Sequence, residues 1–467
     1  MARHPFRAVN LISDPIHGYL ELTKRVEPAE AASAGLPDEE AVEQDLVDSA
    51  WLQRLRRISQ LQSARWVFPT GEHSRFTHGL GVMHEAGLWA RALYPSLRAS
   101  LAAAGDPRPP SEALVVETLR VAGLVHDVGH GPFAHFFDAH VLHDFPAPPD
   151  ARREPGKPLS HEDLSQVIVE RELGGMIRGL RRAPGVDPAR DAFGSGEAIE
   201  PRWVSFLVSK PAIHDEAMPR WVRWLQPLLS GVFTVDNLDY VRRDAYLTGV
   251  AVGPVDVERL RRYAFVSDRG LTLYEPGIGA LEMFLTARLF MYQQVYFHRT
   301  VRAIDLDLAE VFGPSIRAIF GDGSPADRLA DYADLDEYAL LHQAARWARG
   351  ESVDDACRPG DGRVPRPVAE AWRAILLRRP RWRSEAEVRA VYEAGDFPTA
   401  LVAGLGPDEP GRVTIDLAIV DARPAEATAT DSLLAIEGRD GRTDLRMSDA
   451  LGRLPAWALI GRRYRKA

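Results

Sequence analysis

Apolar side chains recur at helical spacing along most of this chain. Val115, Leu119, Ala122 and His126 follow a 4-3-4 spacing, so they lie on one face of an amphipathic helix, with His126 on its buried side. Similar spacing predicts helices over 46–61, 75–93, 112–128, 160–181, 220–246, 277–312 and much of 325–400. The chain is therefore predicted to be mainly α-helical.

Other segments carry turn or strand signals. Pro-rich stretches predict surface loops at 95–111, 144–159 and 183–201. Short strands are predicted at 19–22, 412–422 and 432–441, and the last of these ends in an Asp–Gly turn. We therefore predict an N-terminal segment with a short strand (1–45), a helical domain (46–315) and a smaller α+β region (316–467).

Composition restricts the class of protein. The 467 residues are 45% hydrophobic and 26% charged, which is typical of a globular protein. A formal charge of −9 gives no general attraction to nucleic acid, so an anionic substrate would have to meet local arginine clusters. The single cysteine, Cys357, excludes an intrachain disulfide and a cysteine-based zinc cluster. The chain has no uninterrupted apolar run of about 18 residues and no signal-peptide pattern. We therefore expect a cytoplasmic protein that binds neither membrane nor nucleic acid.

The chemistry of the chain is concentrated in the stretch HDVGHGPFAHFFD, which begins at His126. A Gly-Pro step in its middle marks a helix end followed by a helix start. His130 lies one turn beyond His126, and His135 and Asp138 share a face of the next helix. The adjacent pair His126 and Asp127 is costly to bury unless it binds something, so we predict a metal site.

Imidazole and carboxylate ligands suit a borderline or hard divalent ion, namely manganese, iron, magnesium, nickel or zinc. Two further ligands are needed besides the His–Asp pair. The candidates are His73, His78 and His84 upstream, and Asp236, Asp239 and Asp244 downstream. Asp236, Tyr240 and Arg243 also recur at i, i+4 and i+7, so they could face one site together. Taken singly, each candidate is more often part of a structural salt bridge, so the spacing leaves the choice open.

Seven motifs carry a resemblance to a known family. In chain order they are DPIHGYLEL (14–22), QRLRRISQL (53–61), FPTGEHSRFTHGLGV (68–82), GLVHDVGHGPFAHFFD (123–138), SHED (160–163), DNLDYVRRDAYLTGV (236–250) and ARLFMYQQVYFHR (287–299). With them the sequence resembles the HD-domain phosphohydrolase superfamily over roughly residues 10–310. Within that superfamily it is similar to the deoxynucleoside triphosphate triphosphohydrolases, the branch of the dGTPase-like and the SAM-and-HD-domain proteins.

The resemblance implies a helical HD-domain core and a divalent-metal enzyme that hydrolyses a dNTP to the deoxynucleoside and tripolyphosphate. By position, the implied metal ligands are His78, His126, Asp127 and Asp236. The implied acid–base group is His130, His135, Asp138 and His161, with His161 as the general acid. The implied substrate-binding residues are Gln60, Leu61, Arg75, Tyr240, Asp244, Arg288 and Tyr296. The resemblance also implies a nucleotide activator and a homo-oligomer, either a dimer or a tetramer.

Two positions at the fourth ligand depart from the family pattern. Thr234 and Asn237 stand where the family often has an aspartate and a basic residue. Losing a cation that contacts phosphate would weaken triphosphate binding, unless Arg242 or Arg243 compensates.

Three further positions leave specificity and regulation open. Tyr292 stands where a pocket histidine is common and Phe297 where a glutamine is, so base or sugar preference is open. Asp14 matches a position that reads a guanine base at the family's regulatory site, and it equally fits a turn-initiating aspartate before proline. Two other functions stay open: an HD-type phosphohydrolase or phosphodiesterase acting on another nucleotide, and a nucleotide-sensing protein that assembles on binding its ligand.

Overall fold

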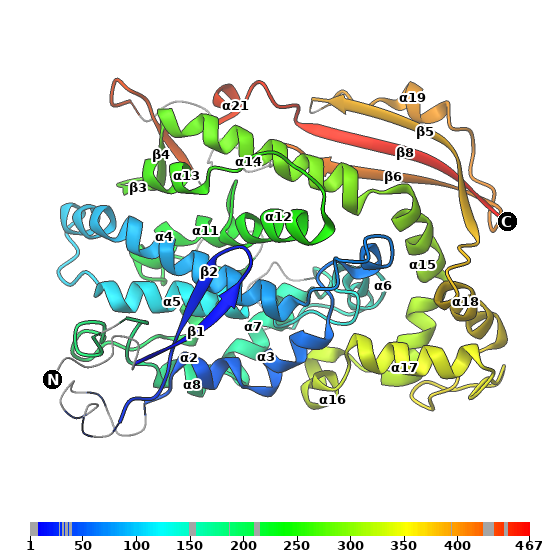
Figure 1. Cartoon of the computed structure of the whole chain (residues 1–467), viewed down its shortest axis with the longest axis horizontal. Coiled ribbons are helices and arrows are strands. Elements are labelled where there is room, and N and C mark those ends of the chain that lie inside the picture. The colour runs from blue at the N-terminus through cyan, green and yellow to red at the C-terminus, as the bar shows by residue number, and fades with distance from the viewer. Residues whose placement is uncertain are drawn as a thin grey trace.

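The computed structural model describes residues 8–27, 29, 32, 36, 40–148, 156–185, 187–209, 215–393, 395–423, 434–442 and 447–467. At the centre of the fold, helix α4 (Arg75–Ala103) packs against α5 (Glu112–Val125) and α12 (Val235–Thr248) (Figure 1). Helices α4 and α12 carry His78 and Asp236, and His126 directly follows α5. The predicted mainly α fold is confirmed.

The close approach of α4 and α5 depends on a glycine. Gly123 of α5 faces the backbone of α4, and a Cβ at that position would lie 2.9 Å from the carbonyl oxygen of Val82. Because glycine has no side chain, the two helices can approach closely. The apolar faces of both helices are buried at this contact, which stabilises the pair.

Further helices surround this pair. Those before α4 are α2 (Glu43–Val47), α3 (Ala50–Arg54), η1 (Leu55–Arg57) and η2 (Gln62–Trp66). Those between α5 and α12 are α6 (His135–His140), η3 (Leu142–Asp144), α7 (His161–Arg171), α8 (Gly174–Gly179), α9 (Pro201–Val208), α10 (Arg220–Leu225) and α11 (Pro227–Ser230). Those after α12 are α13 (Val257–Tyr263), η4 (Glu275–Gly277), α14 (Ile278–Met291), the π-helical η5 (Tyr292–Tyr296), α15 (Arg299–Phe320), η6 (Pro325–Asp327), α16 (Leu329–Ala333), α17 (Glu337–Ala348), α18 (Arg366–Leu376), α19 (Thr399–Ala403) and α21 (Met447–Ala450). Within the described residues, no helix combines the length and apolar character that crossing a membrane requires.

Three small sheets are placed around the helices. The hairpin of β1 (Val9–Asp14) and β2 (Gly18–Thr23) pairs Val9 with Thr23 and Asp14 with Gly18. A second sheet has the order β3-β4-β7, formed by β3 (Ala264–Ser267), β4 (Gly270–Tyr274) and β7 (Ala435–Glu437), with β7 parallel to β4. The third is antiparallel with the order β5-β8-β6, formed by β5 (Trp382–Tyr392), β8 (Trp457–Lys466) and β6 (Val413–Asp421). Its strands lie beside α14 and α15 (Figure 1).

One hydrophobic core joins distant parts of the chain. It includes Leu20 of β2, Leu93 of α4, Trp347 of α17 and Ile436 of β7. The predicted boundary between residues 315 and 316 falls inside α15, and the division into domains stays a prediction.

The helix predicted over 46–61 is wrong in its continuity. The chain forms α2, α3 and η1, and then becomes extended at Ile58. There the N–H of Gln60 donates to His73 (3.0 Å) and the N–H of Arg75 donates to Ile58 (2.9 Å). This pairing with a distant segment outweighs the local helical spacing of the leucines.

Two further predictions need correction. The loop predicted at 95–111 is helical up to Ala103, because Leu97 and Leu101 continue the buried stripe of α4 beyond Pro95. The segment predicted as helical around residues 382–392 is strand β5, which pairs with β8 near the end of the chain.

Several predicted elements are confirmed. Strands were predicted correctly at 19–22 and 412–422, and helices 160–181, 220–246 and 277–312 are present with interruptions. The predicted loops at 144–159 and 183–201 and the strand at 432–441 include residues 149–155, 186 and 432–433, which lie outside the described residues.

Candidate metal centre and active site

Three helices bring two histidines and two aspartates together. His78 lies in the first turn of α4, His126 directly follows the end of α5 and precedes Asp127, and Asp236 lies in the first turn of α12. Nε2 of His78 is 3.2 Å from Oδ1 of Asp236, and Nε2 of His126 is 3.7 Å from the same oxygen. Nε2 of His126 is also 3.3 Å from Oδ1 of Asp127. His78, His126 and Asp127 therefore lie close enough together to share one ion, and Asp236 lies beside both imidazoles.

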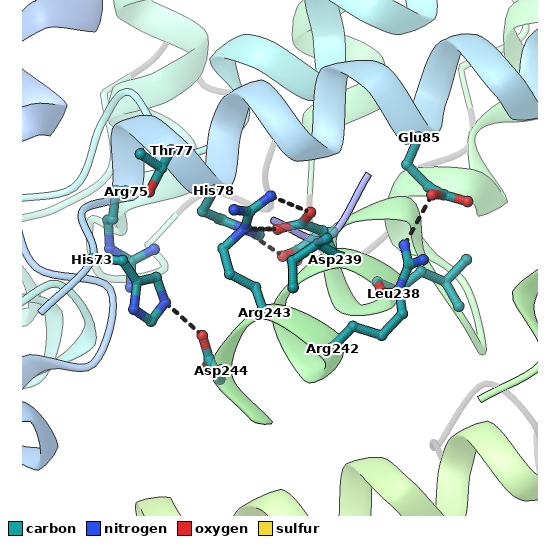
Figure 2. A network of polar contacts seen from close by, with 12 residues as sticks. His73, Arg75, Thr77, His78, Glu85, Leu238, Asp239, Arg242, Arg243 and Asp244 are labelled. Atoms are coloured by element: carbon teal, nitrogen blue, oxygen red, sulfur yellow. Dashed lines mark hydrogen bonds and ion pairs between the residues drawn. The ribbon is translucent and has the colours of Figure 1, made fainter. Parts of the chain in front are cut away.

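The two imidazoles are oriented for metal binding. Nδ1–H of His126 donates to the carbonyl of Gly123 at 2.7 Å, and Nδ1–H of His78 donates to Asp239 at 2.9 Å (Figure 2). Each ring therefore presents the lone pair of Nε2 to the shared point. Nε2 of His126 is buried without a hydrogen-bond partner, as expected for an atom that binds a cation. Two imidazoles and two carboxylates fit a divalent ion of the predicted kinds.

The charges around this point favour a cation. Burial raises the pKa of Asp127, but His126, Arg75 and His130 outweigh it and hold the pKa well below its usual range. Burial lowers the pKa of His78, but hydrogen bonds to Asp236 and Asp239 raise it to about 9. A proton or a metal ion is therefore stabilised between these groups.

A second cluster lies next to the first and contains the four residues of the predicted acid–base group. Nδ1 of His161 lies 2.5 Å from Oδ2 of Asp138, and the ring of His130 is stacked on that of His161 with centroids 3.6 Å apart. His135 and Asp138 share a face of α6, and the His135 side chain is 64% exposed. Nε2 of His130 lies 3.4 Å from Oδ1 of Asp127, which links the two clusters.

Burial and neighbouring charges shift the pKa values of the two stacked imidazoles in opposite directions. Burial lowers the pKa of His161, but Asp138 and Glu162 raise it to about 9. Burial, Arg75 and His161 hold the pKa of His130 well below its usual range. Near neutral pH, His161 is therefore a charged proton donor and His130 is neutral.

The turn that carries His130 is held from outside the predicted motif. Phe133 and Ala134 have φ values of 59° and 48°, in the left-handed region that side chains rarely adopt. The buried Glu337 of α17 accepts the N–H of Phe133 at 3.1 Å, and Arg54 donates to the carbonyl of His130 at 2.6 Å. Sequence reasoning missed Arg54 and Glu337, because their role depends on contacts far apart in the chain.

A cavity of about 620 Å³ opens beside both clusters. Its lining includes all seven predicted substrate residues, which are Gln60, Leu61, Arg75, Tyr240, Asp244, Arg288 and Tyr296. Asp127, Asp236, His135 and His161 also line it, so the cavity reaches both clusters. The volume lies in the range of small-molecule sites.

Several side chains that line this cavity are held in place by hydrogen bonds. The hydroxyl of Tyr296 donates to Asp244 at 2.5 Å, and Nε2 of His73 donates to the other oxygen of that carboxylate at 2.8 Å (Figure 2). The guanidinium of Arg288 lies 5.0 Å from the centre of the Tyr292 ring and donates to the carbonyl of Asp421. These groups present hydrogen-bonding and aromatic surfaces to a ligand.

The sequence left open whether Arg242 or Arg243 supplies the missing cation. Arg242 donates to Glu85 at 2.9 Å (Figure 2), and neither arginine is part of the cavity lining. Asn237 instead caps α12, where its side chain accepts the N–H of Thr234 at 2.8 Å and its own N–H donates to the Thr234 hydroxyl at 3.1 Å. Both departures from the family pattern thus have a structural role. Arg302, which the sequence did not single out, lines the cavity.

The other ligand candidates lie outside the metal cluster. His73 is bonded to Asp244, and the His84 ring lies 5.1 Å from that of His17. Burial lowers the pKa of His84 to about 4. Asp239 contacts the cluster only through His78.

Two family models match this chain. The HD domain model matches residues 75–189, and the model of the HD associated region matches residues 255–351. The chain therefore contains a match to the HD domain at residues 75–189. HD domains bind divalent metals, and the HD motif residues here form the cluster described above.

Proteins of known sequence are similar to this HD-domain protein. Uncharacterized protein YwfO of Bacillus subtilis is 29% identical over 332 residues, which are 67% of this chain and 65% of YwfO. Human deoxynucleoside triphosphate triphosphohydrolase SAMHD1 is 26% identical over 315 residues, which are 65% of this chain and 44% of SAMHD1. The Dictyostelium discoideum SAMHD1 homolog is 25% identical over 309 residues, 66% of this chain and 49% of that protein. The match thus spans about half to two thirds of these relatives.

Solved structures share the fold. A hypothetical protein from Aquifex aeolicus superposes with a TM-score of 0.65 at 22% identity, covering 98% of this chain and 96% of that chain. A phosphohydrolase from Bacteroides thetaiotaomicron superposes with a TM-score of 0.62 at 20% identity, covering 98% and 100%. The resemblance inferred from the motifs is confirmed at the level of an HD-domain protein.

Proposed function

We propose that this HD-domain protein is a metal-dependent dNTP triphosphohydrolase. The observation that carries the proposal is one cavity of about 620 Å³ whose lining includes Asp127 and Asp236, His135 and His161, and all seven predicted substrate-binding residues. The similarity to deoxynucleoside triphosphate triphosphohydrolases supports the same substrate class.

The residues divide the chemistry between them. When bound by His78, His126, Asp127 and Asp236, a divalent cation supplies Lewis-acid polarisation of the α-phosphoryl group and lowers the pKa of water. Arg75, buried and bonded to Asp127, adds positive charge beside the same phosphoryl oxygens.

Proton transfer is assigned to His161. Water adds to the α-phosphorus, the bond from phosphorus to O5′ breaks, and Nε2–H of His161 gives its proton to the departing O5′. The proton that the attacking water loses balances the one that His161 gives up. The products are the deoxynucleoside and tripolyphosphate. Asp138 holds Nδ1 of the same ring and thereby directs Nε2 away from itself.

The nucleoside would lie in the far part of the cavity. Asp244 and Tyr296 are bonded to each other at 2.5 Å and present polar atoms suited to sugar hydroxyls. Gln60, Leu61, Tyr240 and Arg288 complete the surface against sugar and base. The packing of Tyr292 on Phe297, with ring centroids 5.5 Å apart, gives that wall an aromatic face for a base.

A dNTP panel tests this proposal. Metal-loaded protein would be incubated with each dNTP, with Mg²⁺, Mn²⁺ or Fe²⁺, and with and without GTP, and the products separated by chromatography. We expect the deoxynucleoside and tripolyphosphate, and no turnover by the matched Asp236→Ala variant. Release of dNMP and pyrophosphate, or no turnover in any mixture, would contradict the proposal.

A second candidate is a phosphohydrolase acting on a nucleotide with fewer phosphates. It is favoured by Asn237, which caps α12 where the family often has a basic residue. Arg302, which also lines the cavity, is already paired with Asp416. Including nucleoside monophosphates in the panel separates the two candidates.

Assembly and activation by a nucleotide belong to the same proposal, supported by the similarity to SAMHD1 proteins. A homo-oligomer, either a dimer or a tetramer, would form or be stabilised when the activator binds. The Asp14 carboxylate, which the resemblance places at a regulatory site, is bonded to Arg243 at 2.7 Å in this structure. Light scattering with and without GTP tests the assembly.

A further inference from the structure

A buried network next to the metal centre connects it to the N-terminal hairpin. Asp239 of α12 accepts four hydrogen bonds, and Figure 2 shows it beside His78 and Arg243. Its Oδ1 accepts from Nε2 of His17 at 2.6 Å and from Arg243 at 2.9 Å. Its Oδ2 accepts from Nδ1 of His78 at 2.9 Å and from Arg243 at 2.8 Å. Because a carboxylate has about four acceptor positions, this one is saturated.

The hairpin turn is built to present His17 to this carboxylate. Oδ1 of Asp14 accepts the N–H groups of Ile16 at 2.9 Å and His17 at 3.0 Å, which fixes the turn between β1 and β2. Oδ2 of the same Asp14 accepts from Arg243 at 2.7 Å. One aspartate thus shapes the turn and ties it to the arginine that holds Asp239.

No room is left for the network to shift toward α4. Gly81 lies three residues after His78, and a Cβ there would lie 2.1 Å from Oδ1 of Asp239 and 2.3 Å from Nη2 of Arg243. The side chains of His78 and Asp239 are almost completely buried, and only 3% of the His17 side chain is exposed. The carboxylate therefore sits in a closed space bounded by α4, α12 and the hairpin.

We propose that the β1–β2 hairpin is part of the metal centre, with His17 as a positioning residue that acts on His78 through Asp239. The hydrogen bond from His17 keeps the carboxylate in place, and the carboxylate fixes the ring of His78 with Nε2 toward the metal position. Groups that orient a ligand in this way typically contribute about 10–100-fold to metal affinity. The inference rests on the proposed metal site but not on the choice of substrate.

Docking of the hairpin and metal binding should then be coupled. If the docked hairpin raises metal affinity, bound metal must favour the docked hairpin by the same factor. Metal should therefore slow hydrogen exchange of the backbone amides in β1 and β2, although the hairpin supplies no ligand.

Metal affinity of four chains tests the proposal. The dissociation constant for Mn²⁺ would be measured by competition with a chelating dye for the parent chain, His17→Ala, His17→Gln and Tyr19→Ala. We expect His17→Ala to weaken binding about 10-fold or more. His17→Gln should restore most of the affinity, because its amide N–H can donate to Asp239. Tyr19 lies on the same hairpin and is 65% exposed, so Tyr19→Ala is the matched control and should bind as the parent does.

Hydrogen exchange of the parent chain with and without Mn²⁺ gives a readout that needs no variant to fold. We expect slower exchange in β1 and β2 with metal. Parent-like affinity of folded His17→Ala, failure of His17→Gln to restore affinity, or unchanged exchange in the hairpin would each overturn the inference. A parent chain that binds no Mn²⁺ would instead overturn the proposed metal site, and this inference with it. Absence of dNTP turnover with these effects intact would contradict only the proposed reaction.

Discussion

At the scale of single residues, the stacked pair His130 and His161 shows how neighbouring charges shift the pKa values of two histidines in opposite directions. Both rings are buried, yet the pKa of His161 rises to about 9 beside Asp138, while that of His130 falls well below its usual range. One histidine can therefore donate a proton near neutral pH and the other cannot. The residue types alone left this assignment to resemblance, because it depends on which carboxylate each ring meets.

Substituting Asp138→Asn tests the role of this pair. Removing the carboxylate removes the main charge that raises the pKa of His161, so the alkaline limb of the kcat/KM profile should move from near pH 9 to lower pH. The turnover should fall about 10²-fold or more at neutral pH. Asp144→Asn, at an exposed carboxylate nearby, is the control and should keep the parent profile.

The raised pKa of His161 also makes the stability of the fold depend on pH. The folded pKa of His161 lies above the ordinary value of 6.5, so its charged form stabilises the fold fully below about pH 6.5. That contribution is lost as the pH rises through about 9. If the alkaline limb of the kcat/KM profile of Asp138→Asn stayed near pH 9, that result would contradict the assignment of His161 as the proton donor.

At the scale of elements, periodicity predicted the helices that carry the site and missed what holds them. The spacing of Val115, Leu119 and Ala122 located α5, and the Gly-Pro step located the turn after it. The ends of α4 and the break after α3 depend on buried leucines and on pairing of residues 58–60 with 73–75, which no local pattern shows. Strands β5 and β8 were missed because each is stable only against the other.

The support of the 130–134 turn by α17 gives a prediction at this scale. Oε1 of Glu337 accepts the N–H groups of Ser59 and Phe133, both at 3.1 Å, and its Oε2 lies 3.0 Å from Arg65. Glu337→Ala leaves these groups unpaired in the interior, so the free energy of unfolding should fall by roughly 3–5 kcal/mol. Denaturant titration measures this change.

Glu370 lies exposed on α18, and Glu370→Ala should leave the unfolding midpoint unchanged. In Glu337→Ala the turn with positive φ at Phe133 and Ala134 loses a fixed partner, so turnover should fall as well. Parent-like stability and turnover of Glu337→Ala would show that the turn does not depend on α17.

At the scale of the whole molecule, the candidate site collects residues from distant parts of the chain. The predicted metal ligands come from α4, α12 and the end of α5, while Asp421 of β6 and Arg302 of α15 line the adjacent cavity. The motifs predicted which residues would meet, because the predicted metal ligands and pocket residues lie within local sequence patterns that resemble those of a known family. They could not predict that Asp421 of β6 would line the cavity or that His17 of the hairpin would contact Asp239, because both contacts form only in the folded chain.

Metal removal should therefore lower the stability of the whole fold. A cation that binds only the folded chain at 100 times its dissociation constant adds about 2.7 kcal/mol. We expect thermal unfolding to shift upward by several degrees with Mn²⁺ and to return with a chelator. Asp236→Ala, which removes one ligand, should lose most of this dependence, and equal metal dependence in both chains would contradict the ligand set.

Hydrolysis at the α-phosphorus with release of intact tripolyphosphate can be followed by ³¹P NMR in H₂¹⁸O. Metal-loaded protein would be given each dNTP, with and without GTP, and the products followed. We expect tripolyphosphate that carries ¹⁸O on a terminal phosphorus, together with unlabelled deoxynucleoside. Pyrophosphate with dNMP, or ¹⁸O in the deoxynucleoside, would contradict it.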